Sequence, residues 1–130
     1  MRRFTKTVVF FAITAVLLAV AFPAQAASNK WRLQFSGNAE SNGTIVMHIT
    51  PKGGEMIETR TEINKGRSEN GVAKDVTESL HAQLPHGHFH VERDDGEDVL
   101  IKRKHHDDAR FDVKVVSNTV KGVRINPDHE

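Results

Sequence analysis

Cysteine is absent from the 130 residues of this chain. Its absence excludes disulfide bonds, a thiol nucleophile and a lipid anchor on cysteine, so the fold must be stabilised by its core alone. Tyrosine is also absent, and there is one tryptophan. Because few aromatic side chains could stack on bases and the formal net charge is only +1, we predict no nucleic-acid binding.

The first 26 residues are typical of a secretory signal peptide. Arg2, Arg3 and Lys6 precede an apolar run over residues 8–22, and small residues then lead to Ala26. This order of cationic, apolar and small-residue parts predicts export and cleavage after Ala26. The apolar run is shorter than the roughly 20 residues that span a bilayer, so we expect no membrane span after cleavage. The protein is then periplasmic or extracellular.

Residues 27–130 are predicted to form one small α+β domain. Its apolar residues mostly alternate with polar ones, as in half-buried strands, whereas Val72, Val76, Leu80 and Leu84 recur at helical spacing. We expect a mostly antiparallel sheet of about six to seven strands with one amphipathic helix packed on one face. The expected strands cover residues 31–36, 44–50, 57–63, 88–92, 99–101, 111–115 and 120–125, and the expected helix begins at Ser68 or Asn70 and ends at Leu84.

Three short segments have the composition of tight turns. Ser-Asn-Gly at residues 41–43, Pro-Lys-Gly-Gly at 51–54 and Asp-Asp-Gly-Glu at 94–97 each separate two expected strands. Asn, Asp and Gly tolerate the backbone conformations that hairpins need, so each segment predicts a hairpin. The acidic segment lacks the ligand spacing of a helix–loop–helix calcium site, and a turn is the better interpretation.

Histidine is the compositional outlier, because all eight histidines lie in residues 27–130. On a strand, His88 and His90 point to the same face about 6.6 Å apart, a spacing at which two imidazoles can hold one ion. Zn²⁺, Cu²⁺ or Ni²⁺ would suit such ligands. The candidate metal ligands are His86, His88, His90, His105 and His106, and Asp107 and Asp108 could complete the set.

The same histidines also fit a structural interpretation. Phe89 and Val91 alternate with His88 and His90, so the apolar pair would face the core and the histidines would face water. Short histidine clusters are therefore also expected on an exposed strand that binds no metal.

The order of elements from residue 63 to residue 125 resembles a known type of module. A strand ends in Lys-Gly-Arg-Ser at residues 65–68, a helix runs through Leu84, and strands follow at Phe-His-Val 89–91, Val-Leu-Ile 99–101 and Phe-Asp-Val 111–113. This order is similar to strand–helix–hairpin modules of exported bacterial appendage and phage tail proteins, which implies a structural or assembly role without catalytic residues. In the order of helix and strands alone, the chain also resembles small periplasmic domains that inhibit peptidases.

No catalytic motif accompanies these features. The sequence contains neither a Gly-x-Ser-x-Gly elbow nor a His-Glu-x-x-His motif, so we predict a protein that is not an enzyme and has no resident cofactor. Our leading hypothesis is an exported binding or assembly protein that contacts a protein partner of the cell envelope or exterior through a sheet face or an unpaired edge strand. Trp31 is a candidate contact and, alternatively, a core residue. The other hypotheses are periplasmic binding of Zn²⁺ or Cu²⁺ and peptidase inhibition.

Overall fold

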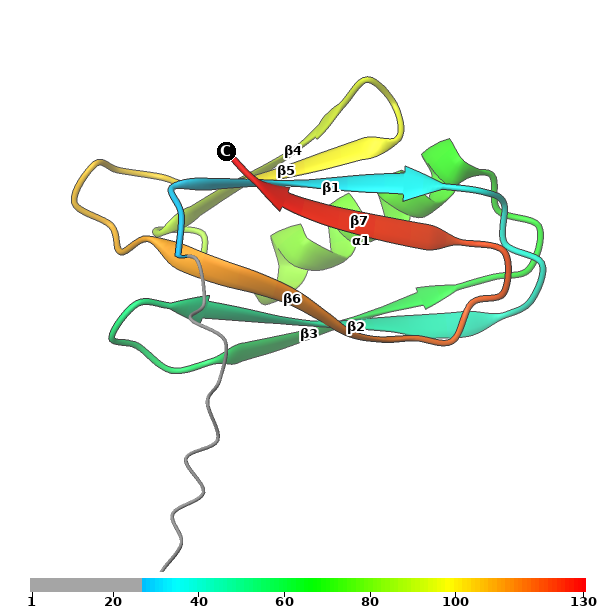
Figure 1. Cartoon of the computed structure of the whole chain (residues 1–130), viewed down its shortest axis with the longest axis horizontal. Helices are drawn as coiled ribbons and strands as arrows, with labels where there is room; N and C mark the ends of the chain where they lie inside the picture. Colours follow the sequence, from blue (N-terminus) through cyan, green and yellow to red (C-terminus); the bar gives the residue numbers. More distant parts are fainter. Residues whose placement is uncertain (1–26) are drawn as a thin grey trace, which may run out of the picture.

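The structure, a computed structural model, describes residues 27–130, and the predicted signal peptide lies outside the described residues (Figure 1). Seven strands and one helix follow one another in this part of the chain. They are β1 (Lys30–Ser36), β2 (Gly43–Pro51), β3 (Ile57–Ile63), α1 (Glu69–Gln83), β4 (Phe89–Asp94), β5 (Asp98–Arg103), β6 (Phe111–Asn118) and β7 (Arg124–His129). The predicted α+β class is confirmed.

The strands form two antiparallel sheets that face each other across the core. One sheet has the order β4-β5-β1-β7 and the other the order β3-β2-β6. The expectation of one sheet was therefore wrong in this respect. Alternation fixes which side of each strand is buried, but it does not determine which strands pair.

The segment at residues 41–43 was predicted to be a hairpin between two paired strands. It connects β1 to β2, which belong to different sheets, so it is a crossing between layers and not the predicted hairpin. Asn42 Oδ1 accepts a hydrogen bond from Lys65 N at 2.8 Å, which fixes this crossing. A Cβ atom at Gly43 would lie 2.7 Å from the backbone carbon of Thr119, so this position needs glycine because two chain segments meet there.

The other two predicted turns are confirmed as hairpins. Residues 52–56 connect β2 to β3, and residues 95–97 connect β4 to β5. In the second hairpin Asp95 has φ 51° and Gly96 has φ 79°, the left-handed conformation that these residue types adopt most easily.

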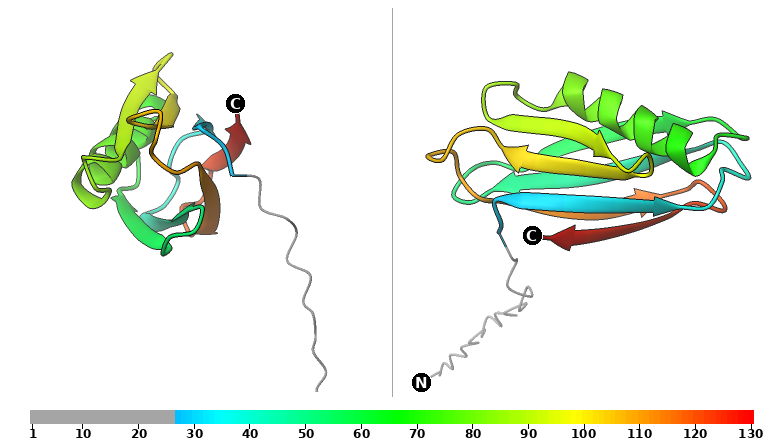
Figure 2. Two further views of the ribbon diagram at one scale, coloured as in Figure 1. Left: turned by 90° about the vertical axis from the view of Figure 1, so that its left-hand side faces the viewer. Right: turned by 90° about the horizontal axis from the view of Figure 1, so that it is seen from above.

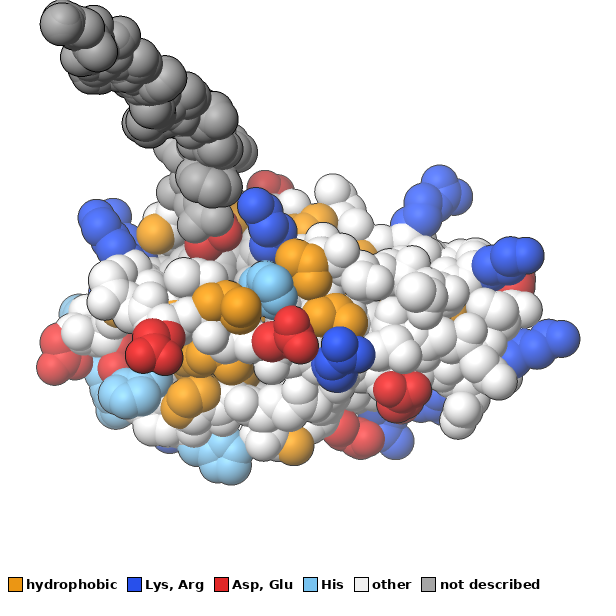
Figure 3. All heavy atoms as spheres, turned by 90° about the horizontal axis from the view of Figure 1, so that it is seen from below, with side chains coloured by type: hydrophobic (Ala, Val, Ile, Leu, Met, Phe, Trp, Pro, Cys, Tyr) orange, Lys and Arg blue, Asp and Glu red, His pale blue; other side chains and the backbone are white. Residues whose placement is uncertain are grey.

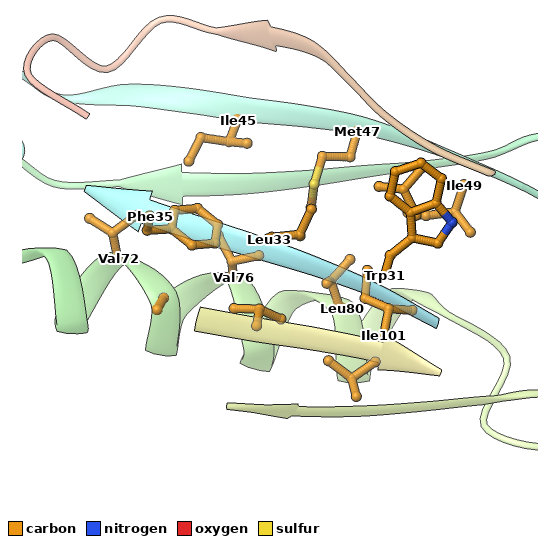
Figure 4. Close-up of a cluster of buried hydrophobic side chains, with 14 of the residues drawn as sticks. Trp31, Leu33, Phe35, Ile45, Met47, Ile49, Val72, Val76, Leu80 and Ile101 are labelled. Atoms are coloured by element: carbon orange, nitrogen blue, oxygen red, sulfur yellow. The ribbon is translucent and has the colours of Figure 1, made fainter. Parts of the chain in front are cut away.

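The core lies between the two sheets. From β1, the side chains of Trp31, Leu33 and Phe35 point toward those of Ile45, Met47 and Ile49 on β2 (Figure 4). All six are buried, which agrees with the alternation expected for these strands.

Helix α1 covers one long side of this sandwich. Ser68 caps it, since Ser68 Oγ accepts a hydrogen bond from Gly71 N at 3.1 Å. Its buried residues include Val72, Val76 and Leu80, which pack onto the core between edge strands β3 and β4 (Figures 2 and 4). The helix thus fills the gap between two sheets instead of lying on the face of one. Within residues 27–130, no helix has the length and hydrophobicity needed to cross a membrane.

The last strand differs most from its prediction. Residues 120–125 were expected to form it, but β7 covers Arg124–His129. Val120 and Val123 are buried in the preceding turn, which closes the end of the sandwich between β6 and β7. Apolar residues in a turn that packs on the core thus gave the pattern of a strand.

Arg32 connects three strands on the outer face of the four-stranded sheet. Its Nη1 donates to Asp94 Oδ2 at 3.0 Å and to Asp98 Oδ2 at 2.7 Å, and its Nε donates to Glu130 Oε2 at 2.7 Å. These carboxylates raise the pKa of Arg32, and the hydrogen bond to Glu130 has the largest effect. The same hydrogen bond, together with one from Lys30, lowers the pKa of Glu130 below its ordinary 4.5.

The helix should contribute strongly to stability through its buried stripe. Leu80 is fully buried, so the variant Leu80→Ala should lower the free energy of unfolding by about 2–5 kcal/mol. Lys74→Ala, at an exposed position of the same helix, should change it by less than about 0.5 kcal/mol. Urea unfolding followed by the fluorescence of Trp31 measures both. Equal losses in the two variants would show that the helix is not part of the core.

The Arg32 cluster should make stability depend on pH. The pKa of Glu130 is lower in the folded protein than in the unfolded protein. As the pH falls, Glu130 therefore takes up a proton in the unfolded protein before it does so in the folded one, and stability falls as pH decreases below about 4.5. We expect Arg32→Gln to destabilise the protein at pH 7 and the difference from wild type to shrink between pH 5 and pH 3. Urea unfolding across this range measures the effect, with Lys74→Gln as control. A pH-independent difference would contradict the assignment.

Candidate functional site

Four of the five predicted histidine ligands lie on two loops at one end of the sandwich, and the fifth, His90, lies on β4. Residues 84–88 connect α1 to β4, and residues 104–110 connect β5 to β6. Lys104 joins the loops, since its N donates to His88 O at 2.9 Å and its Nζ to His86 O at 3.1 Å. Figure 3 shows several histidine side chains near hydrophobic ones toward one end of the molecule.

The imidazole rings at this end have different environments. His86 Nε2–H donates to the backbone oxygen of His81 at 2.6 Å. His90 is exposed on the outer face of β4, with its Nε2 3.8 Å from Glu92 Oε1. His88 precedes the first residue of β4, so it lies in a turn and the alternation argued for His88 and His90 does not apply to it.

His105 and His106 are exposed in the β5–β6 loop. The contacts they provide are backbone ones: His106 O accepts a hydrogen bond from Arg103 Nη1 at 2.6 Å, and His105 N donates to Asp108 Oδ2 at 2.8 Å. Among residues 27–130, no three His, Asp or Glu side chains are grouped so that they could hold one metal ion. The loops thus bring the five histidines to one region without converging their rings.

Two of the predicted residues do form a pair across the loops. His88 Nδ1 lies 2.7 Å from Asp108 Oδ1. The hydrogen bond from His88, followed by that from His105 N, lowers the pKa of Asp108, whose carboxylate is therefore ionised at neutral pH. An ionised carboxylate accepts the bond, so Nδ1 of His88 holds a proton. When the ring holds only this proton, Nε2 has a free lone pair.

A pocket of about 350 Å³ adjoins this pair. Three loops or strand ends contribute to it: the β2–β3 hairpin, the α1–β4 turn and the β5–β6 loop. Its lining residues are Pro51, Ile57, Pro85, His88, Phe89, Asp107, Asp108 and Ala109. The combination of an apolar wall with an oriented imidazole is typical of sites for small ligands.

A second surface lies on the long side of the sandwich opposite α1, between β6 and β7. Both are edge strands (Figure 1), and their side chains line a groove of about 660 Å³. We call it the β6–β7 groove. It is lined by Trp31, Val113, Lys114, Val115, Asn118, Val123, Arg124, Ile125 and Pro127.

The edge of β6 has peptide groups that no strand in residues 27–130 pairs with. Phe111 exchanges two backbone hydrogen bonds with Ser28 at 2.8 and 2.9 Å, so its peptide groups point away from β2. Because bonded and non-bonded positions alternate along an antiparallel strand, the N–H and C=O groups of Val113 and Val115 point to the same free edge.

The edge of β7 is different. Glu130 N donates to Lys30 O at 2.9 Å, and alternation from this bond places the peptide groups of Pro127 on the free side. Proline has no N–H, and proline on an edge strand hinders pairing with a further strand. The free edge of β6 is therefore the better acceptor of an added strand.

Trp31 lies at the floor of the β6–β7 groove. It is 7% exposed, and its Nε1–H donates to Phe111 O at 2.8 Å. The ring of His129 packs against it with ring centroids 5.4 Å apart. The alternative of Trp31 as a core residue is thus confirmed, and its indole also borders this groove.

Comparison with known proteins finds no match, either to a protein-family model or to a curated protein. The resemblance to appendage, phage tail and inhibitor modules stays a prediction. Sequence reasoning missed the pocket and the pairing of His88 with Asp108, although it named both residues. Twenty positions separate them, and only the backbone bonds between the two loops bring them together.

Proposed function

We propose that this chain is an exported, non-enzymatic binding protein that holds an extended segment of a partner protein in the β6–β7 groove. The observation that supports the proposal most is the free edge at Val113 and Val115 beside apolar side chains that remain partly exposed. A partner strand could satisfy these peptide groups and cover the apolar surface at the same time.

The groove favours alternating side chains in such a segment. One side would face Val115 and Ile125, which pack at the margin of the core and are only partly buried. The other side would lie beside Lys114, which is exposed on the outer face of the β3-β2-β6 sheet. Apolar residues suit the first side, and acidic residues suit the second because opposite charges on neighbouring strands attract.

Charge also favours a foreign partner over a second copy of this chain. Lys114 and Arg124 both line the groove, so its borders are cationic. Two copies of β6 paired antiparallel around Lys114 would place two ammonium groups side by side, which is unfavourable. The register of β6 also shifts near Val115, which limits the length of edge that a strand can follow. We therefore expect an acidic, extended partner segment.

Synthetic peptides test this proposal. A capped eight-residue peptide that alternates valine and glutamate should bind, while the same peptide with lysine in place of glutamate should bind less tightly. Trp31, the single tryptophan, lies in the groove, so its fluorescence in a titration reports binding. Lys114→Glu should reverse the preference between the peptides.

A matched pair of variants tests the strand edge itself. Val115→Pro removes an N–H that points to the free edge and leaves the bonds to β2 in place, so it should abolish binding. Val115→Thr keeps the N–H and should retain binding. Circular dichroism and urea unfolding check that both fold. If the glutamate peptide binds Val115→Pro as tightly as wild type, the β6 edge is not the contact.

A second function, binding of Zn²⁺ or Cu²⁺, is favoured by one observation. Metal-ligating histidines usually donate their second ring N–H to a carboxylate, and His88 has this relation to Asp108. Loop movement would be needed to bring His86, His90, His105 or His106 to the same ion, since their rings do not converge.

Calorimetry decides between metal binding and the structural interpretation. If the metal function is correct, Zn²⁺ or Cu²⁺ should bind with micromolar or tighter affinity, and a double variant His88→Ala/His90→Ala should lose most of it. A His48→Ala variant, altered on β2 away from these loops, is the control. Identical isotherms for wild type and the double variant would exclude His88 and His90 as ligands.

A further inference from the structure

We infer that the pocket beside His88 and Asp108 binds a small ligand that has one apolar ring and a hydroxyl group, with the hydroxyl donating a hydrogen bond to His88 Nε2. This site is separate from the β6–β7 groove, and the inference does not depend on the proposed function. It rests on the polarity of the His88–Asp108 pair, the apolar lining of the pocket and the bonds that hold the two loops.

The polarity of the imidazole is fixed by its partner. Asp108 Oδ1 faces His88 Nδ1 at 2.7 Å, and Asp108 Oδ2 accepts from His105 N at 2.8 Å. Both carboxylate oxygens are thus engaged, and the side chain of Asp108 is only 12% exposed. The free group that remains is Nε2 of His88, whose side chain is 67% exposed, and in the neutral ring this nitrogen accepts a hydrogen bond.

The rest of the pocket favours a small apolar body. Pro51, Ile57, Pro85 and Phe89 contribute most of the non-polar lining. Phe89 is held in place by an edge-to-face contact with Phe111, with ring centroids 5.2 Å apart. A volume of about 350 Å³ is near the lower limit for ligand pockets, so it suits one ring better than a larger ligand.

The loops that form the pocket are held in place by their own hydrogen bonds. Arg103 Nη1 donates to Asp108 O at 3.0 Å, and Asp108 N donates to His105 O at 3.1 Å. Lys104 N donates to His88 O at 2.9 Å across the two loops. His88 and Asp108 are therefore oriented before a ligand arrives, which reduces the entropic cost of binding.

A neutral hydroxyl fits this site better than a charged group. An anionic ligand would meet the carboxylates of Asp107 and Asp108, both of which line the pocket. An ammonium group would lose its hydration against a mostly apolar wall. A hydroxyl donates one hydrogen bond to Nε2 and brings no charge, so a phenol is the simplest probe.

Three ring compounds provide the test: p-cresol, toluene and benzylammonium. In NMR titrations of the purified protein at pH 8.5, p-cresol should shift the amide signals of the pocket and bind roughly fivefold tighter than toluene. Asp108→Asn should abolish this preference, because an amide that donates to Nδ1 moves the ring proton to Nε2. Asp107→Asn, a matched loss of charge in the same pocket, should preserve it.

His88→Phe tests the same bond at an exposed position without changing Asp108, and it should bind p-cresol and toluene equally. Equal binding of the two compounds to wild type would overturn the role of Nε2. Tighter binding of benzylammonium that depends on Asp107 would overturn the choice of a hydroxyl. Absence of shifts at the pocket up to the solubility limit of p-cresol would overturn the site itself.

Discussion

A sandwich of two sheets has two long sides along which its apolar interior meets water, and the single helix of residues 27–130 covers only one of them. Helix α1 covers the side between β3 and β4 with Val72, Val76 and Leu80. On the opposite side, between β6 and β7, no helix of residues 27–130 covers the core, and Val115 and Ile125 remain partly exposed. This unequal coverage creates the β6–β7 groove, so the candidate contact surface is a consequence of how the core is enclosed.

The same arrangement explains why the pocket lies at the end of the sandwich. Strands of both sheets end there. The core-facing positions of these strands are occupied mostly by apolar side chains, whereas the loops that connect the strands carry polar ones. Hydrogen bonds from the backbone N of Lys104 and from the guanidinium of Arg103 fix these loops, so His88 and Asp108 meet although they are distant in sequence. A rigid scaffold with oriented residues on its loops is the usual basis of a binding site.

The sequence predicted the positions of the helix and strands better than it predicted which strands pair with each other. Alternation located β3 at residues 57–63, and helical spacing located α1, because each pattern records local exposure. The division into two sheets depends on contacts between distant strands, which leave no local pattern. For the same reason, His88 and Asp108 could be named as candidate ligands, but their contact could not be predicted. The strand expected at residues 120–125 was placed too early because the buried residues of the turn have the apolar pattern of a strand.

Trp31 connects the core to the β6–β7 groove. Phe111 O accepts hydrogen bonds from both Trp31 Nε1 and Ser28 N, each at 2.8 Å, so one carbonyl of β6 secures the indole and the segment that leads into β1. Trp31 and Val123, which follows the turn after β6, both line the β6–β7 groove. The proposed partner strand would lie between these two residues. The free edge is short, cationic and bulged, features that oppose unspecific pairing while leaving room for one complementary segment.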